Sequence, residues 1–443
     1  MLRTRALALT VTLLASGGAA DANPHSKFPT GVDAREPTLF HFTIDYAYEM
    51  VSATIVREGV GEPVDPLAPL PKHDDLSFKQ YRHTMIPKAE LGVYRGTWIS
   101  FAVPVVIAQA RELSLASGIT RDGSSTIRDG LLTADGFDAR DPGTPLPAGG
   151  DLVFRGISRQ GVEQLRFGLA VAPMAQLADD TKPTWKLGAE LRLSVGRTMR
   201  FDRMKADSET GVSSGIHELR LWTSFARRYD RAEAWFELFW QVPLTARKGS
   251  LYDDIDQAPG KFGATSTMPG QRAGAAFGVE LYAINDVVEH NSVSLDLGAR
   301  VVGHFEGRGY SEMWEVFAFA GDVRTEGPLV LDRDPTDPGV QAFSHPGITN
   351  IENYLETAGR IAVRAELGKR ISFGAIVDLI WKTDHVISFA DAGVDRDDDN
   401  DLVNPGTDEV NPLHAPQIDL VGHRYHSEDN FGLSIGVQAQ LLF

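Results

Sequence analysis

The last thirteen residues, FGLSIGVQAQLLF, alternate almost perfectly between apolar side chains and small or polar ones. The apolar set is Phe431, Leu433, Ile435, Val437, Ala439, Leu441 and Phe443. The intervening set is Gly432, Ser434, Gly436, Gln438, Gln440 and Leu442. A period of two residues predicts a β-strand with one apolar face. Soluble proteins seldom end on an apolar strand with a free terminal phenylalanine.

The same alternation recurs along the whole chain and predicts about twelve strands, each long enough to cross a bilayer when tilted. The expected strands are 38–50, 80–94, 97–109, 161–174, 183–195, 215–227, 232–244, 270–284, 291–305, 353–367, 370–386 and 428–443. Short connections and long, Gly-, Asp- and Pro-rich connections follow one another in rotation. The segment 311–320 (SEMWEVFAFA) is one further stretch that could count as a strand.

This pattern resembles the outer-membrane β-barrels of Gram-negative bacteria, which have an even number of strands and both termini on one side. The resemblance implies an all-β fold: a single transmembrane antiparallel up-and-down barrel with short periplasmic turns and long extracellular loops. It also implies a location in the outer membrane of a Gram-negative bacterium, in contact with lipid and lipopolysaccharide. The terminal Phe443 resembles the signal that the barrel-assembly machinery reads.

Aromatic residues near the ends of the expected strands favour the same environment. Their amphipathic rings are suited to the headgroup zone of a membrane, where they form girdles. The set is Tyr46, Tyr48, Tyr94, Trp98, Trp185, Tyr229, Trp240, Tyr282, Trp381 and Phe443.

The N-terminus has the pattern of a secretory signal peptide. Arg3 and Arg5 precede an apolar core, and residues 20–22 (ADA) offer a small-x-small cleavage site. We therefore expect a signal peptide over 1–22, a short periplasmic segment over 23–37 and the barrel over 38–443. The sequence contains no cysteine, which excludes disulfides and lipoprotein attachment.

The faces opposite the apolar ones carry charges of mixed sign, which could not face hydrocarbon without a cost of several kcal/mol each. They are expected to line a lumen. The principal pore-lining candidates are Arg166, Lys186, Glu190, Arg192, Arg220, Glu237, Arg272, Glu280, Asp296, Arg300, Arg360, Arg364 and Asp378. The net charge of −17 argues against nucleic acid as a partner.

Two interpretations of this wall compete. Opposed charges around a watery space, with room left by inward glycines such as Gly168, Gly188 and Gly274, would make a narrow porin-like channel for passive passage of small solutes. Charges that neutralise each other would instead make a closed barrel with a structural or surface-interaction role. We favour the channel.

An acidic stretch suggests a metal site. Asp395, Asp397, Asp399 and Asp401 alternate as the first oxygen ligands of a Ca²⁺ loop do. The pattern departs from an EF-hand because Asn400 stands where glycine is needed, so a solvated acidic loop is the alternative. No other cofactor is expected.

Catalysis is not expected, although an outer-membrane acyl hydrolase is a third alternative. Such a hydrolase needs a serine and a histidine near the outer rim on the lipid face. The sequence contains no GxSxG motif, and His426 and Ser427 are merely adjacent in an expected loop.

Overall fold

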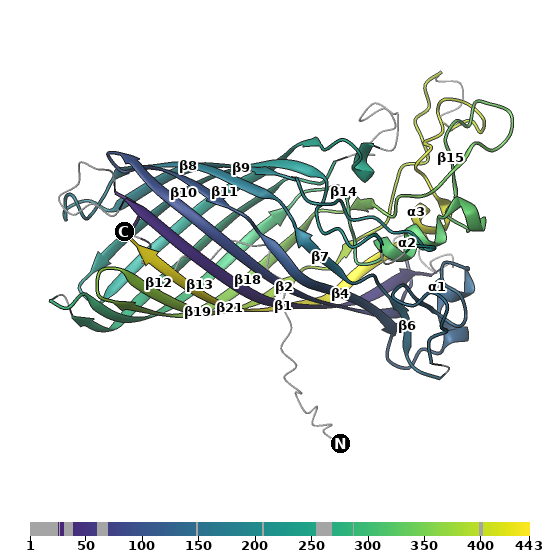
Figure 1. Cartoon of the computed structure of the whole chain (residues 1–443). Coiled ribbons are helices and arrows are strands. Elements are labelled where there is room, and N and C mark those ends of the chain that lie inside the picture. Colours follow the sequence, from purple (N-terminus) through teal and green to yellow (C-terminus); the bar gives the residue numbers. More distant parts are fainter. Residues whose placement is uncertain are drawn as a thin grey trace.

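The computed structural model describes His25 and residues 27–30, 39–59, 70–147, 149–205, 208–253, 268–286, 288–397 and 402–443. The expected signal peptide lies outside the described residues. The chain forms a closed barrel of 12 antiparallel strands (Figure 1). Among the described residues, no helix is long and apolar enough to span a bilayer.

Each strand of the barrel pairs with the next along the chain, and the last strand pairs with the first to close the sheet. In order they are β1 (Phe40–Glu58), β2 (Lys72–Tyr94), β3 (Thr97–Ala102) continued by β4 (Val105–Leu115), β7 (Arg159–Val162) continued by β8 (Leu165–Met174), β9 (Thr184–Leu193), β10 (Ile216–Tyr229), β11 (Ala232–Ala246), β12 (Arg272–Asp286), β13 (Asn291–His304), β18 (Tyr354–Leu367), β19 (Ile371–Lys382) and β21 (Tyr425–Leu442). The twelve predicted strands are thereby confirmed, although β1, β2 and β4 extend further into the long connections than predicted, to Glu58, from Lys72 and to Leu115.

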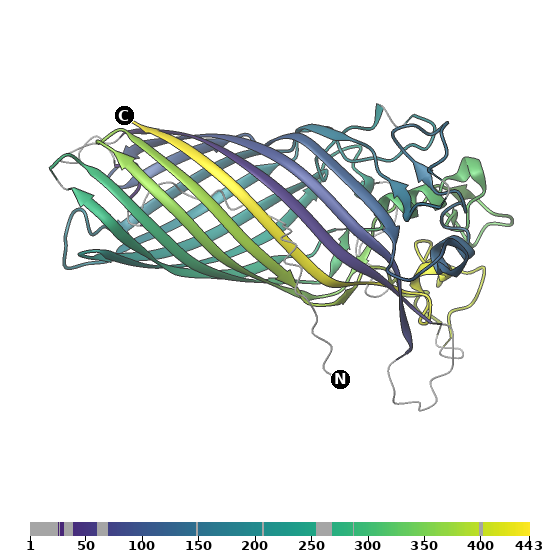
Figure 2. The ribbon, with the colours of Figure 1, turned by 90° about the horizontal axis from the view of Figure 1, so that it is seen from below.

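The two ends of the barrel differ. The end that we call the turn end carries the short connections and the C-terminus, where the carbonyl oxygen of Phe443 accepts hydrogen bonds from the amides of Leu39 (2.7 Å) and Phe40 (3.1 Å). One of its two-residue turns places Arg95 and Gly96 at positive φ (36° and 72°), as this kind of hairpin requires. The other end, which we call the loop end, carries the long connections (Figures 1 and 2).

Connections at the loop end fold into a compact mass with its own apolar core, which we call the cap. Its helices are α1 (Ser125–Arg128), α2 (Trp314–Ala320) and α3 (Pro416–Asp419), accompanied by the 3₁₀ turns η1 (Arg121–Gly123), η3 (Leu251–Asp253) and η4 (Val323–Thr325). Its short strands are β5 (Phe137–Asp138), β6 (Leu152–Arg155), β14 (Gly307–Gly309), β15 (Leu331–Asp332), β16 (Ala342–Phe343), β17 (Thr349–Ile351) and β20 (His385–Val386).

The candidate strand at 311–320 is wrong, because this segment forms helix α2 at the centre of the cap. Trp314, Val316 and Phe317 are all fully buried there, and the core also takes in Leu131 and Ile418 from other connections. A helix buried on all sides shows no period of two or of 3.6. The segment could therefore not be distinguished from a buried strand by pattern alone.

The wall follows the predicted alternation. Apolar side chains such as Ile99, Leu169, Ile361 and Val437 are exposed on the outside, while the intervening side chains point inward. Two of the expected girdle residues are exceptions. Trp98 and Tyr282 are buried on the inner face, where Trp98 lines the lumen and the hydroxyl of Tyr282 donates to Glu233 (3.3 Å). The other eight expected girdle residues are half-buried or exposed.

Candidate functional site: the lumen

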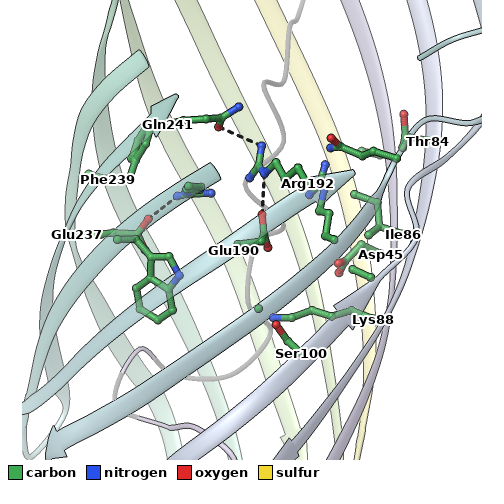
Figure 3. A pocket seen from close by; sticks show the side chains of 18 of the residues that line it. Asp45, Thr84, Ile86, Lys88, Ser100, Glu190, Arg192, Glu237, Phe239 and Gln241 are labelled. Carbon is green, nitrogen blue, oxygen red and sulfur yellow. Dashed lines mark hydrogen bonds and ion pairs between the residues drawn. The ribbon is translucent and has the colours of Figure 1, made fainter. Parts of the chain in front are cut away.

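A cavity of about 610 Å³ occupies the inside of the barrel. Its wall takes side chains from strands around the whole sheet, and Figure 3 shows several of them converging from opposite sides. At the loop end Tyr252 and Tyr310 border the cavity, and at the turn end Phe28 does. The space therefore extends along the barrel between the cap and the N-terminal segment.

The structure places most of the predicted pore-lining residues on this cavity. Those that line it are Arg166, Lys186, Glu190, Arg192, Arg220, Glu237, Arg272, Arg300, Arg360 and Asp378. The remaining three, Glu280, Asp296 and Arg364, point inward but contact one another instead. The Arg364 guanidinium lies 3.0 Å from Glu280 and 3.1 Å from Asp296, and all three side chains are almost fully buried.

Most lumen charges form ion pairs along the wall. Arg192 binds Glu190 (2.7 Å), as drawn in Figure 3, and Arg220 binds Glu237 (2.7 Å). Other pairs also link residues of the same or nearby strands: Arg360–Asp378 (2.7 Å), Arg272–Glu218 (3.0 Å) and Arg300–Glu356 (2.8 Å). Because these pairs run along the wall, they stiffen it without bridging the central space.

The N-terminal segment lies inside the barrel where it is described. The imidazole of His25 stacks on Trp235 (4.1 Å between ring centroids), and Phe28 packs against Trp98 (5.5 Å). Lys27 forms an ion pair with Glu366 (2.7 Å). The expectation of a periplasmic segment over 23–37 therefore does not describe these residues, because the lumen offers them aromatic faces and opposite charge.

Inward glycines do not leave the free space expected of them. The position of a side chain at Gly188 is taken by the Trp222 ring, at Gly274 by the Phe239 ring and at Gly168 by Ser100. Glycine is needed at the first two positions because a neighbouring aromatic side chain lies across the backbone. The lumen is consequently narrower, and more aromatic, than the glycine count predicted.

Sequence reasoning missed the lumen cation Arg82 and its partner Glu163. Arg82 lies on the inward face of β2, buried against Glu163 (2.8 Å) and near Glu49 (4.0 Å). Arg82 is six residues from Lys88, which also lines the cavity, so both side chains lie on the same face of β2. The alternation within 80–94 could therefore have identified Arg82. Glu163 sits in the interruption between β7 and β8, where alternation gives no signal.

Among the described residues of the cap, outside the membrane-spanning strands, Asp419 and His345 have strongly shifted pKa values. Burial raises the pKa of Asp419 to about 7, although its carboxylate accepts a hydrogen bond from the Ala415 amide (2.8 Å). Burial, assisted by the charge of Arg308, lowers the pKa of His345 to about 3. These shifts matter for the stability of the cap rather than for the lumen.

In the acidic connection, Asp395 and Asp397 lie with Glu409 so that one carboxylate oxygen of each falls within 4.8 Å of the others. Asp399 and Asp401 lie outside the described residues. Glu409 accepts hydrogen bonds from the amides of Arg396 (3.0 Å) and Asn404 (2.8 Å), which lower its pKa. The Ca²⁺ site stays a prediction, now with Glu409 as a neighbour of the first two predicted ligands.

A closed barrel with an apolar outer surface, a charged inner wall, short turns at one end and long loops at the other is a transmembrane β-barrel. The fold of the chain is that of the outer-membrane β-barrels.

Comparisons find structural resemblance alone. An outer membrane channel from Pseudomonas putida F1 is 11% identical, with a TM-score of 0.41 over 96% of this chain and 100% of that one. A FadL homologue from Pseudomonas aeruginosa is 8% identical, with a TM-score of 0.31 over 91% of this chain and 90% of that one. A deletion mutant of the TodX monoaromatic hydrocarbon channel is 9% identical, with a TM-score of 0.32 over 92% and 91%. No family model and no curated protein matches the sequence.

Proposed function

We propose that the protein is a narrow channel for the passive passage of small solutes through its charged lumen. The observation that carries the proposal is the cavity of about 610 Å³, which reaches from the N-terminal segment to the cap. A barrel that served only as a scaffold would be expected to fill its interior, as eight-stranded barrels do. Ion pairs along the wall, rather than across it, support the same conclusion.

The competing function is a closed barrel with a structural or surface-interaction role. The specific observation in its favour is the cap, whose buried residues form one apolar cluster with the loop ends of β1, β2 and β21. Under our proposal, the cap and the N-terminal segment narrow the path at its two ends and solutes pass beside them.

Conductance across planar bilayers distinguishes the two functions. We expect the purified, folded protein to produce discrete single-channel currents that are small compared with those of wide porins. Currents no larger than those of protein-free bilayers would contradict the channel and favour the closed barrel.

We also propose that the protein acts by transport and not by catalysis. Ser427 is fully buried and donates its hydroxyl to Asn430 (2.9 Å), while His426 binds Glu58 (3.1 Å). A buried serine without exposure to lipid does not suit an acyl hydrolase acting at the rim. Calcium-dependent release of fatty acid from phospholipid, lost in Ser427→Ala, would overturn this proposal.

The partners follow from the surfaces. The exposed apolar belt suits lipid, the cap suits contact with lipopolysaccharide, and the exposed terminal Phe443 suits the barrel-assembly machinery. The mobile partners are the small solutes themselves.

A further inference from the structure

Two lumen cations differ from all the others. Arg166 and Lys186 line the cavity, are only 7% and 8% exposed, and have no carboxylate oxygen within 4.0 Å in the part of the chain that the structure describes. The amide oxygen of Gln164, in its hydrogen-bonding orientation, accepts two bonds of 3.0 Å from the Arg166 guanidinium, so that this cation has a neutral partner. A buried cation without an anion is costly, and a bound anion would offset that cost.

The strand register also places a second positive charge next to Arg166. Arg166 on β8 stands directly opposite Arg192 on β9, a placement of like charges that destabilises an antiparallel pair. Glu190 forms its ion pair with Arg192 (2.7 Å), and both Glu190 and Glu163 act on Arg166 only from beyond 4.0 Å. The balance of the whole cavity has the same sign, with ten Lys and Arg on its wall against eight Asp and Glu, in a chain whose net charge is −17.

Two rows of inward residues lie between these two cations: a polar row with Ser100, Glu190 and Arg220 on the side of Arg166, and an apolar row on the side of Lys186. Five residues that are successive register partners across β3, β8, β9, β10 and β11 form what we call the aromatic row: Trp98, Ala170, Gly188, Trp222 and Phe239. All except Gly188 border the cavity. The Trp222 ring lies over Gly188.

The two cations stand on either side of this row. Lys186 lies two residues from Gly188 toward the turn end, about 7 Å along the strand. Arg166 lies four residues from Ala170 toward the loop end. Phe28 packs against Trp98, and the Arg220 guanidinium lies 4.6 Å from the centre of the Phe239 ring, so Trp222 is the ring of the row that we assign to a solute. The row has on each side of it, along the barrel, a cation with no carboxylate oxygen within 4.0 Å among the described residues.

We propose that the lumen binds small aromatic carboxylates, with the ring against the aromatic row and the carboxylate on Lys186, and that Arg166 attracts them from the loop end. The inference rests on the proposed channel function and deepens it by naming the solute class. An indole face accepts a second aromatic ring by offset stacking, while an ammonium group binds the carboxylate through charge-assisted hydrogen bonds. Inorganic phosphate shares the oxyanion chemistry but offers nothing to the aromatic row.

Calorimetric titration of the purified, folded full-length protein in detergent tests the proposal without requiring conduction. The probes are benzoate and inorganic phosphate. We expect benzoate to bind at least tenfold more tightly than phosphate, and Lys186→Gln to weaken benzoate binding about tenfold, the value of one charge-assisted hydrogen bond. Trp222→Leu should weaken benzoate binding and leave phosphate binding unchanged.

The control is Lys248→Gln, which removes the same charge from an exposed position in a loop. Resistance of the folded form to unfolding in sodium dodecyl sulfate verifies that each variant is assembled. Equal affinity for the two probes, or unchanged benzoate binding in Lys186→Gln, would overturn the inference. If the protein binds benzoate but conducts no current, the binding site is supported and the channel function is contradicted. Failure of the site and failure of the channel can therefore be told apart.

Discussion

Arg159 and Glu315 join the barrel wall to the cap through a buried ion pair, with 2.6 Å between the guanidinium and the carboxylate. Arg159 also donates to the carbonyl oxygens of Arg200, Glu209 and Gly211, and its guanidinium lies 4.8 Å from the centre of the Trp314 ring. A single side chain of β7 thus holds helix α2 and a second connection in place. The cap is therefore held to the barrel wall by a buried ion pair and hydrogen bonds, and not by apolar contacts alone.

Replacing Glu315 with glutamine should loosen the cap, because Arg159 would stay buried without its counter-charge. Removal of one partner of a buried pair costs about 3–5 kcal/mol. We expect faster proteolysis within 306–352 and a larger single-channel conductance, while the twelve strands of the barrel stay paired. Glu326→Gln is the control, since Glu326 is exposed in the same connection. Equal proteolysis of the two variants would show that the pair does not anchor α2.

The N-terminal segment should restrict current at the turn end. Phe28→Ala removes the ring that packs on Trp98 and borders the cavity, so we expect a higher conductance and shorter closed intervals. Leu177→Ala is the matched control, because Leu177 is an exposed apolar residue in a connection at the same end. A conductance equal to that of the wild type in both variants would mean that the segment does not obstruct the path.

The positions of the strands, and the side chains on each strand that face outward, could be predicted because alternation is a local property that every strand repeats. Pairing of charges could not, since it depends on register: Arg360 meets Asp378 only because β18 and β19 pair with those residues directly opposite. The aromatic row was missed for the same reason. Trp98 near a strand end satisfies the girdle rule, and only its parity shows that it faces inward.

The cap was also beyond prediction. Its core combines residues such as Leu131, Phe317 and Ile418, which lie in three connections far apart in the sequence. Similarly, Glu409 joins Asp395 only when the acidic connection folds back on itself, as the bridge between Gly393 and Val410 shows. Long-range contacts of this kind leave no period in the sequence.

The cap should lose stability as the pH rises from about 4 to about 7, owing to Asp419. Its pKa is raised from 3.8 to about 7, so the folded state binds the proton more tightly than the unfolded state. The stabilisation is therefore complete below about pH 4 and is lost at about 1.4 kcal/mol per pH unit up to about pH 7.

Thermal unfolding of Asp419→Asn and of the wild type at pH 5 and pH 8 measures this loss. Between pH 5 and pH 8, the unfolding temperature of the variant should fall less than that of the wild type. Comparison at each pH cancels the contribution of His345, whose lowered pKa acts in the opposite direction by favouring the cap as the pH rises. Parallel changes in both proteins would show that Asp419 does not titrate in this range.

Calcium should stabilise the acidic connection if Asp395, Asp397 and Glu409 bind it together. Binding to the folded state alone raises stability by about 2.7 kcal/mol at a hundredfold excess over Kd. We expect EDTA to lower the unfolding temperature by a few degrees and Asp397→Asn to abolish that difference. Asp408→Asn is the control, since Asp408 is an exposed neighbour outside the trio. Identical unfolding with Ca²⁺ and with EDTA would leave a solvated acidic loop.

Phe443 should serve assembly rather than the stability of the finished barrel. Its side chain is 60% exposed, whereas its backbone oxygen accepts from Leu39 and Phe40 and its amide donates to Phe40 (2.8 Å). Phe443→Ala retains these backbone bonds and loses little burial, so the unfolding temperature and conductance of folded protein should stay unchanged. The yield of folded protein in the membrane should fall severalfold.

The control is Leu441→Ala, which removes an exposed apolar side chain from the same face of β21 and should leave the yield near that of the wild type. Equal yields from the two variants would remove the case for a terminal aromatic signal, and a lowered unfolding temperature in Phe443→Ala would assign the residue to closure of the barrel instead.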